Sequence, residues 1–388
     1  MSGKPAVAVI GGGVSGLSCA LTVAELGCKD VVLIERNSIA SGSSGLSAGV
    51  FTRQYVTQLD IQLRTNAYEA FAELEREDGL LIARNGFLRL GHDAETVSQF
   101  EAGAKRQREL GVHDAVVLSP DEVANLIPDM ECSDIVGGMY CPTDGHLDGH
   151  QLCMIYARKA EALGVRILQQ TPLTGVEVGT RHTHRLLTTA GEIECDVVIN
   201  AAGSWASEVG ELLGARVTVI PQRHQICRGQ LMSPPDCSMP FVMDYVVGSG
   251  EPGLYFRREG RDQLLAGLHT NEVLQSECED PDDYKGGVDF EFMELVATKL
   301  RTRLPGIGEI GLHNGWAGLY PMSLDGMPMV GPFAEQPTVI AACGLGGVGV
   351  NLSPIVGRLA AEWVVYGEPR AIEGAEKLSP NRFSAVAA

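Results

Sequence analysis

The stretch AVAVIGGGVSGLSCALTVAELGCKDVVLIER, residues 6–36, decides the fold of this chain. A short apolar run, 7–10, leads into a glycine-rich turn, and a segment with helical spacing of apolar residues follows as far as Leu26. A second apolar run, 31–34, ends in Glu35. This order of strand, glycine-rich turn, helix, strand and acidic residue within about 30 residues predicts a dinucleotide-binding βαβ unit. The full pattern is more specific evidence than a GxGxxG motif alone.

Each glycine and the acidic residue of this unit have a physical role. Gly11 permits the tight turn, Gly13 lets the backbone approach a pyrophosphate, and Gly16 lets the helix pack against the strand. The helix N-terminus offers free N–H groups and a partial positive charge to the phosphates. Glu35 is placed to accept hydrogen bonds from ribose hydroxyls, and its charge would repel a 2′-phosphate, so NADP is disfavoured.

Length and charge narrow the class of protein. The 388 residues leave room for two domains with large cores, and the net charge of −19 disfavours nucleic acid and anionic lipid as partners. No secretory pattern precedes the first strand and no apolar run has transmembrane length, so we expect a cytoplasmic protein without a membrane span. The cysteines show no CxxC or zinc spacing, and His146 and His150 flank Asp148, which suits a helix N-cap, so we expect no metal site.

Hydrophobic periodicity places the other elements. It predicts helices over 58–77, 95–110, 149–163 and 290–300, and hairpins over 80–92, with a turn at 85–86, and over 173–189. Strand-like runs recur at 217–220, 225–231, 254–257, 263–268 and 313–320, which indicates an antiparallel sheet with a covering helix. Near the C-terminus a strand, 338–342, precedes a helix that we expect to begin at Ser353 as N-cap with Pro354 in its first turn.

Three further segments point to the cofactor. The serine- and glycine-rich stretch 37–53 directly follows the ribose-binding acid, where its N–H and hydroxyl groups can surround a pyrophosphate. DVVINAAGS, 196–204, is a second buried strand that ends in small residues. CGLGGVGVNL, 343–352, opens another helix whose N-terminus could face a group that becomes negative on reduction, as flavin does, and this favours FAD over NAD.

These motifs, together with GWAGLYPMSLDGMPMVG at 315–331, resemble the D-amino-acid-oxidase-like flavoprotein family, in particular its sarcosine oxidase, glycine oxidase and dimethylglycine dehydrogenase branch. The resemblance covers nearly the whole chain with the motifs in family order. It implies an α/β plus α+β architecture with two domains. A discontinuous Rossmann-like FAD-binding domain takes 1–85, 149–215 and 325–388, and an antiparallel-sheet substrate-binding domain takes 86–148 and 216–324.

The resemblance also implies a reaction. The family oxidises the C–N bond of a secondary or primary amino acid, such as sarcosine, glycine or another N-alkyl amino acid, by hydride transfer to flavin N5, and the resulting imine hydrolyses. Two alternatives stay open: an FAD enzyme that acts on a 2-hydroxy acid or another C–OH group, and a non-catalytic FAD-binding subunit or assembly factor. The electron acceptor would be oxygen or another molecule, and the chain could form homo- or hetero-oligomers.

Site residues follow from the resemblance position by position. The positions that match cofactor contacts are Gly11, Gly13, Val14, Ser15, Gly16, Glu35, Arg36, Ser43, Ser44, Ala48, Gly49, Val176, Gly203, Trp205, Gly346, Gly347, Val348, Gly349 and Leu352. Arg53 falls where related enzymes hold the substrate carboxylate, and Tyr255 and His269 fall where they line the substrate pocket. These three residues are the expected catalytic group.

The chain departs from the family at positions that bear on chemistry. Gly318 and Leu46 stand where relatives attach flavin covalently through cysteine or histidine, so the resemblance implies noncovalent FAD. Leu265 replaces the lysine that helps related oxidases react with oxygen, and Asn351 replaces a second carboxylate-binding lysine. A dehydrogenase that passes electrons to another acceptor is therefore nearly as well supported as an oxidase.

Overall fold

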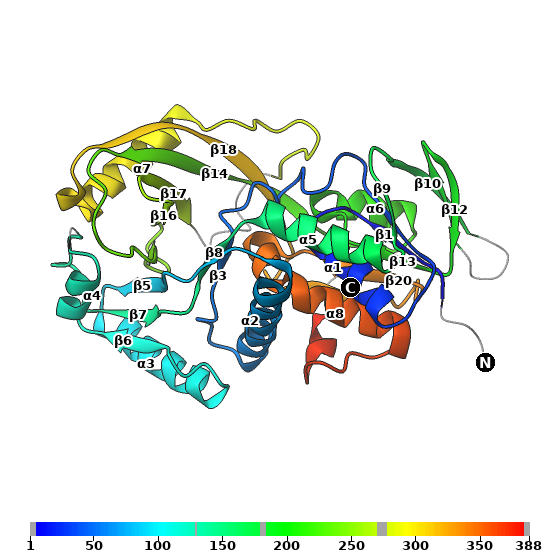
Figure 1. The fold of residues 1–388 in the computed structure, drawn as a ribbon, viewed down its shortest axis with the longest axis horizontal. Coiled ribbons are helices and arrows are strands. Elements are labelled where there is room, and N and C mark those ends of the chain that lie inside the picture. The colour runs from blue at the N-terminus through cyan, green and yellow to red at the C-terminus, as the bar shows by residue number, and fades with distance from the viewer. Residues whose placement is uncertain (1–4, 129, 179–183, 270–277, 384–388) are drawn as a thin grey trace.

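The computed structural model describes residues 5–128, 130–178, 184–269 and 278–383. Two large sheets organise it, and Figure 1 shows them side by side along the longest axis of the molecule, with α1, α5 and α8 around the first and α3, α4 and α7 around the second. The helices are α1 (Val14–Glu25), α2 (Gln58–Asp78), α3 (Ala94–Glu109), α4 (Pro120–Leu126), α5 (Gly149–Ala162), α6 (Ala206–Leu212), α7 (Phe290–Arg303) and α8 (Gly349–Tyr366).

The first sheet has six strands in the order β19-β20-β13-β1-β2-β9. Its strands are β1 (Val7–Ile10), β2 (Val31–Ile34), β9 (Arg166–Leu168), β13 (Val197–Asn200), β19 (Met329–Pro332) and β20 (Val339–Cys343), all parallel except β19. A parallel sheet covered on both faces needs apolar residues at every position. Val7 and Val9 pack with α1, α5 and α8, whereas Ala8 and Ile10 pack with α6 on the opposite face. This is the predicted Rossmann-like arrangement.

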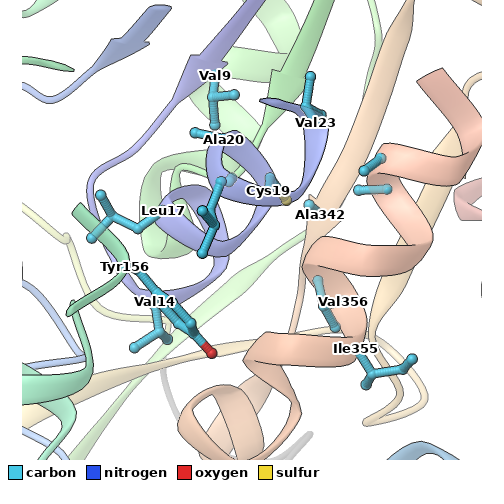
Figure 2. Packing of buried hydrophobic residues seen from close by; sticks show 14 of the residues in the cluster. Val9, Val14, Leu17, Cys19, Ala20, Val23, Tyr156, Ala342, Ile355 and Val356 are labelled. Carbon is cyan, nitrogen blue, oxygen red and sulfur yellow. The ribbon is translucent and has the colours of Figure 1, made fainter. Parts of the chain in front are cut away.

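The core of this part lies where α1 meets α8. Figure 2 shows α1, which carries Leu17 and Ala20, beside α8, which carries Ile355 and Val356, with the Tyr156 ring of α5 next to Val14. The two helices approach closely because Gly357 has no side chain: a Cβ there would lie 2.1 Å from Ser18 Oγ. The first βα turn is therefore held rigidly by the last long helix of the chain.

The second sheet has eight strands in the order β18-β14-β17-β16-β15-β5-β7-β6. They are β5 (Phe87–Gly91), β6 (Val116–Leu118), β7 (Gly137–Cys141), β14 (Ile220–Leu231), β15 (Phe241–Asp244), β16 (Gly253–Glu259), β17 (Gln263–His269) and β18 (Ile310–Met322). Every pairing is antiparallel except β5 with β15. This confirms the predicted antiparallel-sheet domain; the exact domain boundaries stay a prediction.

Small sheets complete the fold. β10 (Leu173–Val178), β11 (His184–Thr188) and β12 (Gly191–Cys195) form an antiparallel sheet, so the predicted hairpin over 173–189 is confirmed, although 179–183 lie outside the described residues. β3 (Val50–Phe51) and β4 (Ile82–Ala83) flank β8 (Gly145–Leu147) in a second sheet. None of the helices in the described part of the chain has the length and apolar character to span a bilayer.

The predicted hairpin over 80–92 is wrong. β4 pairs with β8, whereas β5 pairs with β7 and β15 in the large sheet. Gly86 does adopt a turn conformation, with φ +94°, but the residues around it bond to distant segments: Asn85 Nδ2 donates to Met239 O and Gly86 N to Asp144 O. The turn passes the chain from one sheet to another, which local turn chemistry cannot distinguish from a hairpin.

The last long helix also begins earlier than predicted, at Gly349 rather than after Ser353. Ser353 is fully buried inside α8, and Pro354 follows it. A proline there leaves the carbonyl of Val350 without its helical N–H donor. Ser353 Oγ donates to that carbonyl over 3.1 Å, so the serine compensates for the proline instead of capping the helix. The helices expected over 58–77, 95–110, 149–163 and 290–300 are confirmed within a few residues.

Candidate active site

A cavity of about 440 Å³ opens between the two sheets. One end is lined by the first βα turn, the serine-rich segment after β2, the residues after β13 and the start of α8. The other end is lined by side chains of β14, β16 and β18 from the large sheet. Sites at the carboxyl ends of parallel strands are expected in this architecture, and the volume lies in the range of small-molecule pockets.

The first βα turn is shaped for close approach of a ligand. Gly11 has φ +114°, and a Cβ there would lie 2.4 Å from Ala201 O. Gly13 forms the N-cap of α1 without any side-chain cap, and the first turn of the helix carries no acidic residue. Val14 N donates to Ser44 Oγ over 3.0 Å, which brings the serine-rich segment to the helix end. The remaining free N–H groups are suited to phosphate oxygens.

Glu35 stands at the end of β2 and lines the cavity. Gly12 N donates to its Oε2 over 2.6 Å and Asn37 N to its Oε1 over 2.7 Å. Backbone N–H groups therefore fix the carboxylate in one orientation. Carboxylate oxygens have further lone pairs, so this fixed group can also accept hydrogen bonds from ribose hydroxyls.

The start of α8 forms the second glycine-rich border of the cavity. Its N-cap, Val348, makes no side-chain cap and the first turn has no acidic residue. Gly346 and Gly347 pack under neighbouring side chains: a Cβ would lie 2.8 Å from Met322 Sδ and 2.5 Å from Tyr320 Cε2, respectively. Two helix N-termini whose N-cap residues make no side-chain cap thus border one cavity, and this donor set fits a ligand with a pyrophosphate and an electron-rich ring system such as FAD.

Most of the predicted cofactor residues line this cavity. These are Gly11, Gly13, Val14, Ser15, Glu35, Arg36, Ser43, Ser44, Ala48, Gly203, Trp205, Gly346, Gly347 and Gly349. The others are packing positions: Gly16, Gly49, Val176, Val348 and Leu352. A Cβ on Gly16 would lie 1.9 Å from Gly11 O, and one on Gly49 would lie 1.7 Å from Leu147 O. Leu352 is fully buried in the core, and cofactor contacts at these five positions stay a prediction.

The residues Arg36 and Trp205 join the cofactor end to a loop of the large sheet. Arg36 Nη2 lies 2.9 Å from Asp282 Oδ1, and Trp205 Nε1 donates to the same oxygen over 3.0 Å. The guanidinium carbon lies 5.0 Å from the centre of the Trp205 ring. Both charged side chains are about half exposed, so the ion pair contributes little to the stability of the fold.

Aromatic side chains of the large sheet form the opposite wall. His224 of β14 stacks on Tyr320 of β18 with ring centres 3.8 Å apart, and Trp316 Nε1 donates to Leu46 O over 2.7 Å. Burial, and secondly the charge of His269, lowers the pKa of His224 to about 4, so this imidazole is neutral at pH 7. His224, Trp316 and Tyr320 were not predicted as site residues. The signal that could have found them is their alternation on β14 and β18, which puts them on one face of the sheet.

Tyr255 and His269 occupy different places. Tyr255 lines the cavity and is almost completely buried, and burial followed by the effect of Tyr320 raises its pKa well above the ordinary value. His269 ends β17 and meets the edge of Tyr245 with ring centres 5.1 Å apart. It is outside the residues that line the cavity, and its charge contributes to the lowered pKa of His224; its predicted place in the substrate pocket stays a prediction.

The Arg53 side chain contacts carboxylates of the protein and is not among the residues that line the cavity. Its Nε donates to Asp144 Oδ1 over 2.9 Å, its backbone N donates to Asp144 Oδ2 over 3.0 Å, and Nη2 lies 3.5 Å from Asp114. Nη2 also donates to Thr143 Oγ1, and the guanidinium stacks on the Tyr68 ring at 4.0 Å. The predicted role of Arg53 in binding a substrate carboxylate stays a prediction, and two of its three side-chain nitrogens, Nε and Nη2, already have partners in the protein. Asn351 is likewise engaged: its Nδ2 donates to Thr52 O over 3.0 Å.

Comparison with known proteins places the chain in a family. Residues 6–363 match the family described as DAO, FAD dependent oxidoreductase, so the chain belongs to that family. It is 27% identical over 372 residues to human mitochondrial sarcosine dehydrogenase, and 27% identical over 394 residues to human mitochondrial dimethylglycine dehydrogenase. These matches cover 94% and 97% of this chain but only 40% and 44% of the relatives, so the chain spans about two-fifths of their length.

Solved structures confirm the fold. The L-proline dehydrogenase of P. horikoshii superposes with a TM-score of 0.87 at 24% identity, over 100% of this chain and 99% of that one. The glycine oxidase of Geobacillus kaustophilus superposes with a TM-score of 0.81 at 22% identity, over 98% and 99%. Both are complete-length matches, so the two-part architecture with a discontinuous cofactor domain is that of the family.

Proposed function

We propose that this family member oxidises the C–N bond of a small amino acid, with a secondary or primary amine such as those of N-methylglycine, glycine or proline. When bound, FAD supplies the hydride acceptor, so the amino acid loses a hydride from a carbon next to nitrogen and the imine that remains is hydrolysed. The names of the relatives and structural neighbours, all amino-acid dehydrogenases or oxidases among those reported above, support this class of substrate.

The observation that carries the proposal is the wall of neutral aromatic groups beside the two helix N-termini. Tyr255, Trp316 and Tyr320 enclose the substrate end, and His224 is uncharged there. A desolvated site disfavours an ammonium ion, so an amine that enters it binds in the deprotonated form. Only that form has the nitrogen lone pair that assists loss of the hydride. The site needs no strong base, because binding itself favours loss of the proton.

The chain's own residues orient the partners. The N-terminus of α1, with Ser44 beside it, would hold the pyrophosphate, and Glu35 the ribose. The N-terminus of α8 would face the ring portion and stabilise negative charge there. The stacked His224 and Tyr320 rings then form a rigid floor against which a small substrate is positioned.

We further propose that FAD is noncovalent and that oxygen is a poor acceptor. Gly318 and Leu46 line the cavity and have no nucleophilic atom, and a Cβ on Gly318 would touch Leu46 at 3.3 Å. Leu265 is buried among apolar side chains that include Tyr255 and Ile226, so it brings no positive charge to the site. Because no positive charge from this position helps oxygen to react, we expect the electrons to pass to a separate acceptor, as in a dehydrogenase.

An anaerobic titration tests the proposal. FAD-loaded protein is mixed with secondary amino acids, D- and L-amino acids and 2-hydroxy acids, and the flavin absorbance is followed. Bleaching by an amino acid, with slow recovery in air, is the expected result. Bleaching by 2-hydroxy acids alone would favour oxidation of a C–OH group. A flavin that dithionite reduces but no compound bleaches would favour a non-catalytic role, which is relevant because the chain is also 25% identical to a mouse mitochondrial pyruvate dehydrogenase phosphatase regulatory subunit.

A further inference from the structure

The face of the large sheet that lines the cavity continues to an arginine beyond it. Residues that pair directly across neighbouring strands share a face of the sheet. One such row runs from β18 to β5 through Trp316, Ile226, Gly267, Tyr255, Met243 and Arg89. Trp316, Ile226 and Tyr255 line the cavity. Arg89 is two strands from Tyr255, about 10 Å at the usual spacing of neighbouring strands.

Arg89 has no acidic partner among the described residues, unlike its neighbours. Arg64 is paired with Asp60 over 2.8 Å and Arg53 with Asp144 over 2.9 Å. The surroundings of Arg89 are the rings of Phe87 and Tyr55, whose centres lie 5.1 and 5.8 Å from its guanidinium carbon. Its Nε is buried without a hydrogen-bond partner. Burial lowers the pKa of Arg89, and a hydrogen bond with Tyr55 and the charge of Asp144 offset part of that effect.

A second unsatisfied polar group lies on the segment that covers this strand. Gln54 is buried, and its Nε2 donates to Phe87 O over 2.7 Å, two residues before Arg89 on the same strand. Its Oε1 has no partner among the described residues. A buried donor or acceptor without a partner destabilises the folded state, so native structures hold few of them. A ligand with an anionic group and an N–H group would satisfy both.

We propose that Arg89 binds the carboxylate of the amino-acid substrate, the role that sequence comparison had assigned to Arg53. A guanidinium recognises a carboxylate through two parallel hydrogen bonds, and it also packs favourably on aromatic rings such as those of Phe87 and Tyr55. Arg257 is another arginine on this face, but its Nε donates to Ala48 O over 3.1 Å and its guanidinium is paired with Glu259. It is therefore less free than Arg89 to bind a carboxylate of the substrate. This inference rests on the proposed function, because it assumes an amino-acid substrate.

The test measures binding without turnover. Methoxyacetate replaces the amine of N-methylglycine by an ether oxygen and keeps the carboxylate, while 2-methoxyacetamide is its neutral counterpart. Calorimetric titration of FAD-loaded protein is expected to show a 10- to 100-fold weaker dissociation constant for methoxyacetate in Arg89→Met, a smaller loss in Arg89→Lys, and no change for the amide. Arg76→Met is the matched control, since Arg76 is a largely exposed arginine on α2.

Thermal unfolding separates a binding role from a structural one. Removal of the Arg89 guanidinium, which has no acidic partner among the described residues, is expected to leave the melting temperature unchanged or raise it, whereas a structural arginine would lower it. Unchanged methoxyacetate affinity in Arg89→Met, or a wild-type protein that binds the amide as tightly as the acid, would overturn the proposal.

The two proposals fail separately. If amino acids bleach the flavin in Arg89→Met with wild-type concentration dependence, the C–N oxidation stands and the role of Arg89 is refuted. If methoxyacetate binding depends on Arg89 but no amino acid bleaches the flavin, the carboxylate site stands and the proposed function is refuted.

Discussion

Replacement of Arg53 by methionine is expected to destabilise the protein severely, because it leaves a buried charge without its partner. The Asp144 side chain is fully buried, and it accepts from Arg53 Nε, Arg53 N and Thr52 Oγ1 over 2.8–3.0 Å. Loss of one partner of a buried ion pair costs about 3–5 kcal/mol, whereas an exposed pair such as Arg76–Glu77 is worth less than about 1 kcal/mol. Arg53→Met should therefore lower the free energy of unfolding by about 3–5 kcal/mol and Arg76→Met by less than about 1 kcal/mol.

The assay is urea unfolding in saturating FAD, followed by tryptophan fluorescence, with the free energy taken by linear extrapolation. Two further results identify the cause. The double variant Arg53→Met/Asp144→Asn should recover most of the loss, since it removes the buried charge as well. Burial already raises the pKa of Asp144, with Arg53 opposing it, so the cost of Arg53→Met should shrink as the pH falls and the carboxyl takes up a proton. An Arg53→Met variant as stable as Arg76→Met, but with weakened methoxyacetate binding, would refute this reasoning and restore Arg53 to the substrate site.

Three other predictions follow from the same structure. Gly16→Ala places a methyl group 1.9 Å from Gly11 O and should abolish FAD retention on gel filtration, whereas Gly103→Ala, with its nearest neighbour at 3.8 Å, should retain FAD fully. The hydrogen bond to Asp244 raises the pKa of His92, so the stability that this pair contributes is complete below the ordinary pKa of about 6.5 and is lost as the pH rises through the raised value; His92→Gln should destabilise the protein more at pH 6 than at pH 9 in thermal melts. Acid precipitation should release all of the flavin into the supernatant as FAD, and colour that stays with the pellet would show a covalent bond.

The cofactor end of the cavity could be predicted from the sequence because the residues that form it lie close together along the chain. The turn at Gly11 and Gly13, the helix that follows and the acid at Glu35 lie within one βαβ unit, and each residue type there is required by a close approach or an N–H group. The glycine-rich start of α8 was found for the same reason, although its helix begins four residues before Ser353 because that serine compensates for Pro354.

The substrate end was harder to predict because its residues meet only through sheet pairing. His224, Tyr320 and Arg89 are far apart in the sequence, and each is unremarkable in its own segment. Their common face becomes visible only when the strand order and register are known. The surroundings of Arg53 could not be predicted for a related reason: its partner Asp144 is 91 residues away, so the sequence could not show that its Nε is already paired.

The central claim, oxidation of a C–N bond, is tested most directly by a single anaerobic turnover. FAD-loaded protein is mixed with an excess of the amino acid that bleaches it fastest, and the carbonyl product of imine hydrolysis is trapped with a hydrazine and counted against the flavin reduced. The account predicts one carbonyl and one free amine per reduced flavin. Reduced flavin without these products, or no reduction by any amino acid, would contradict it.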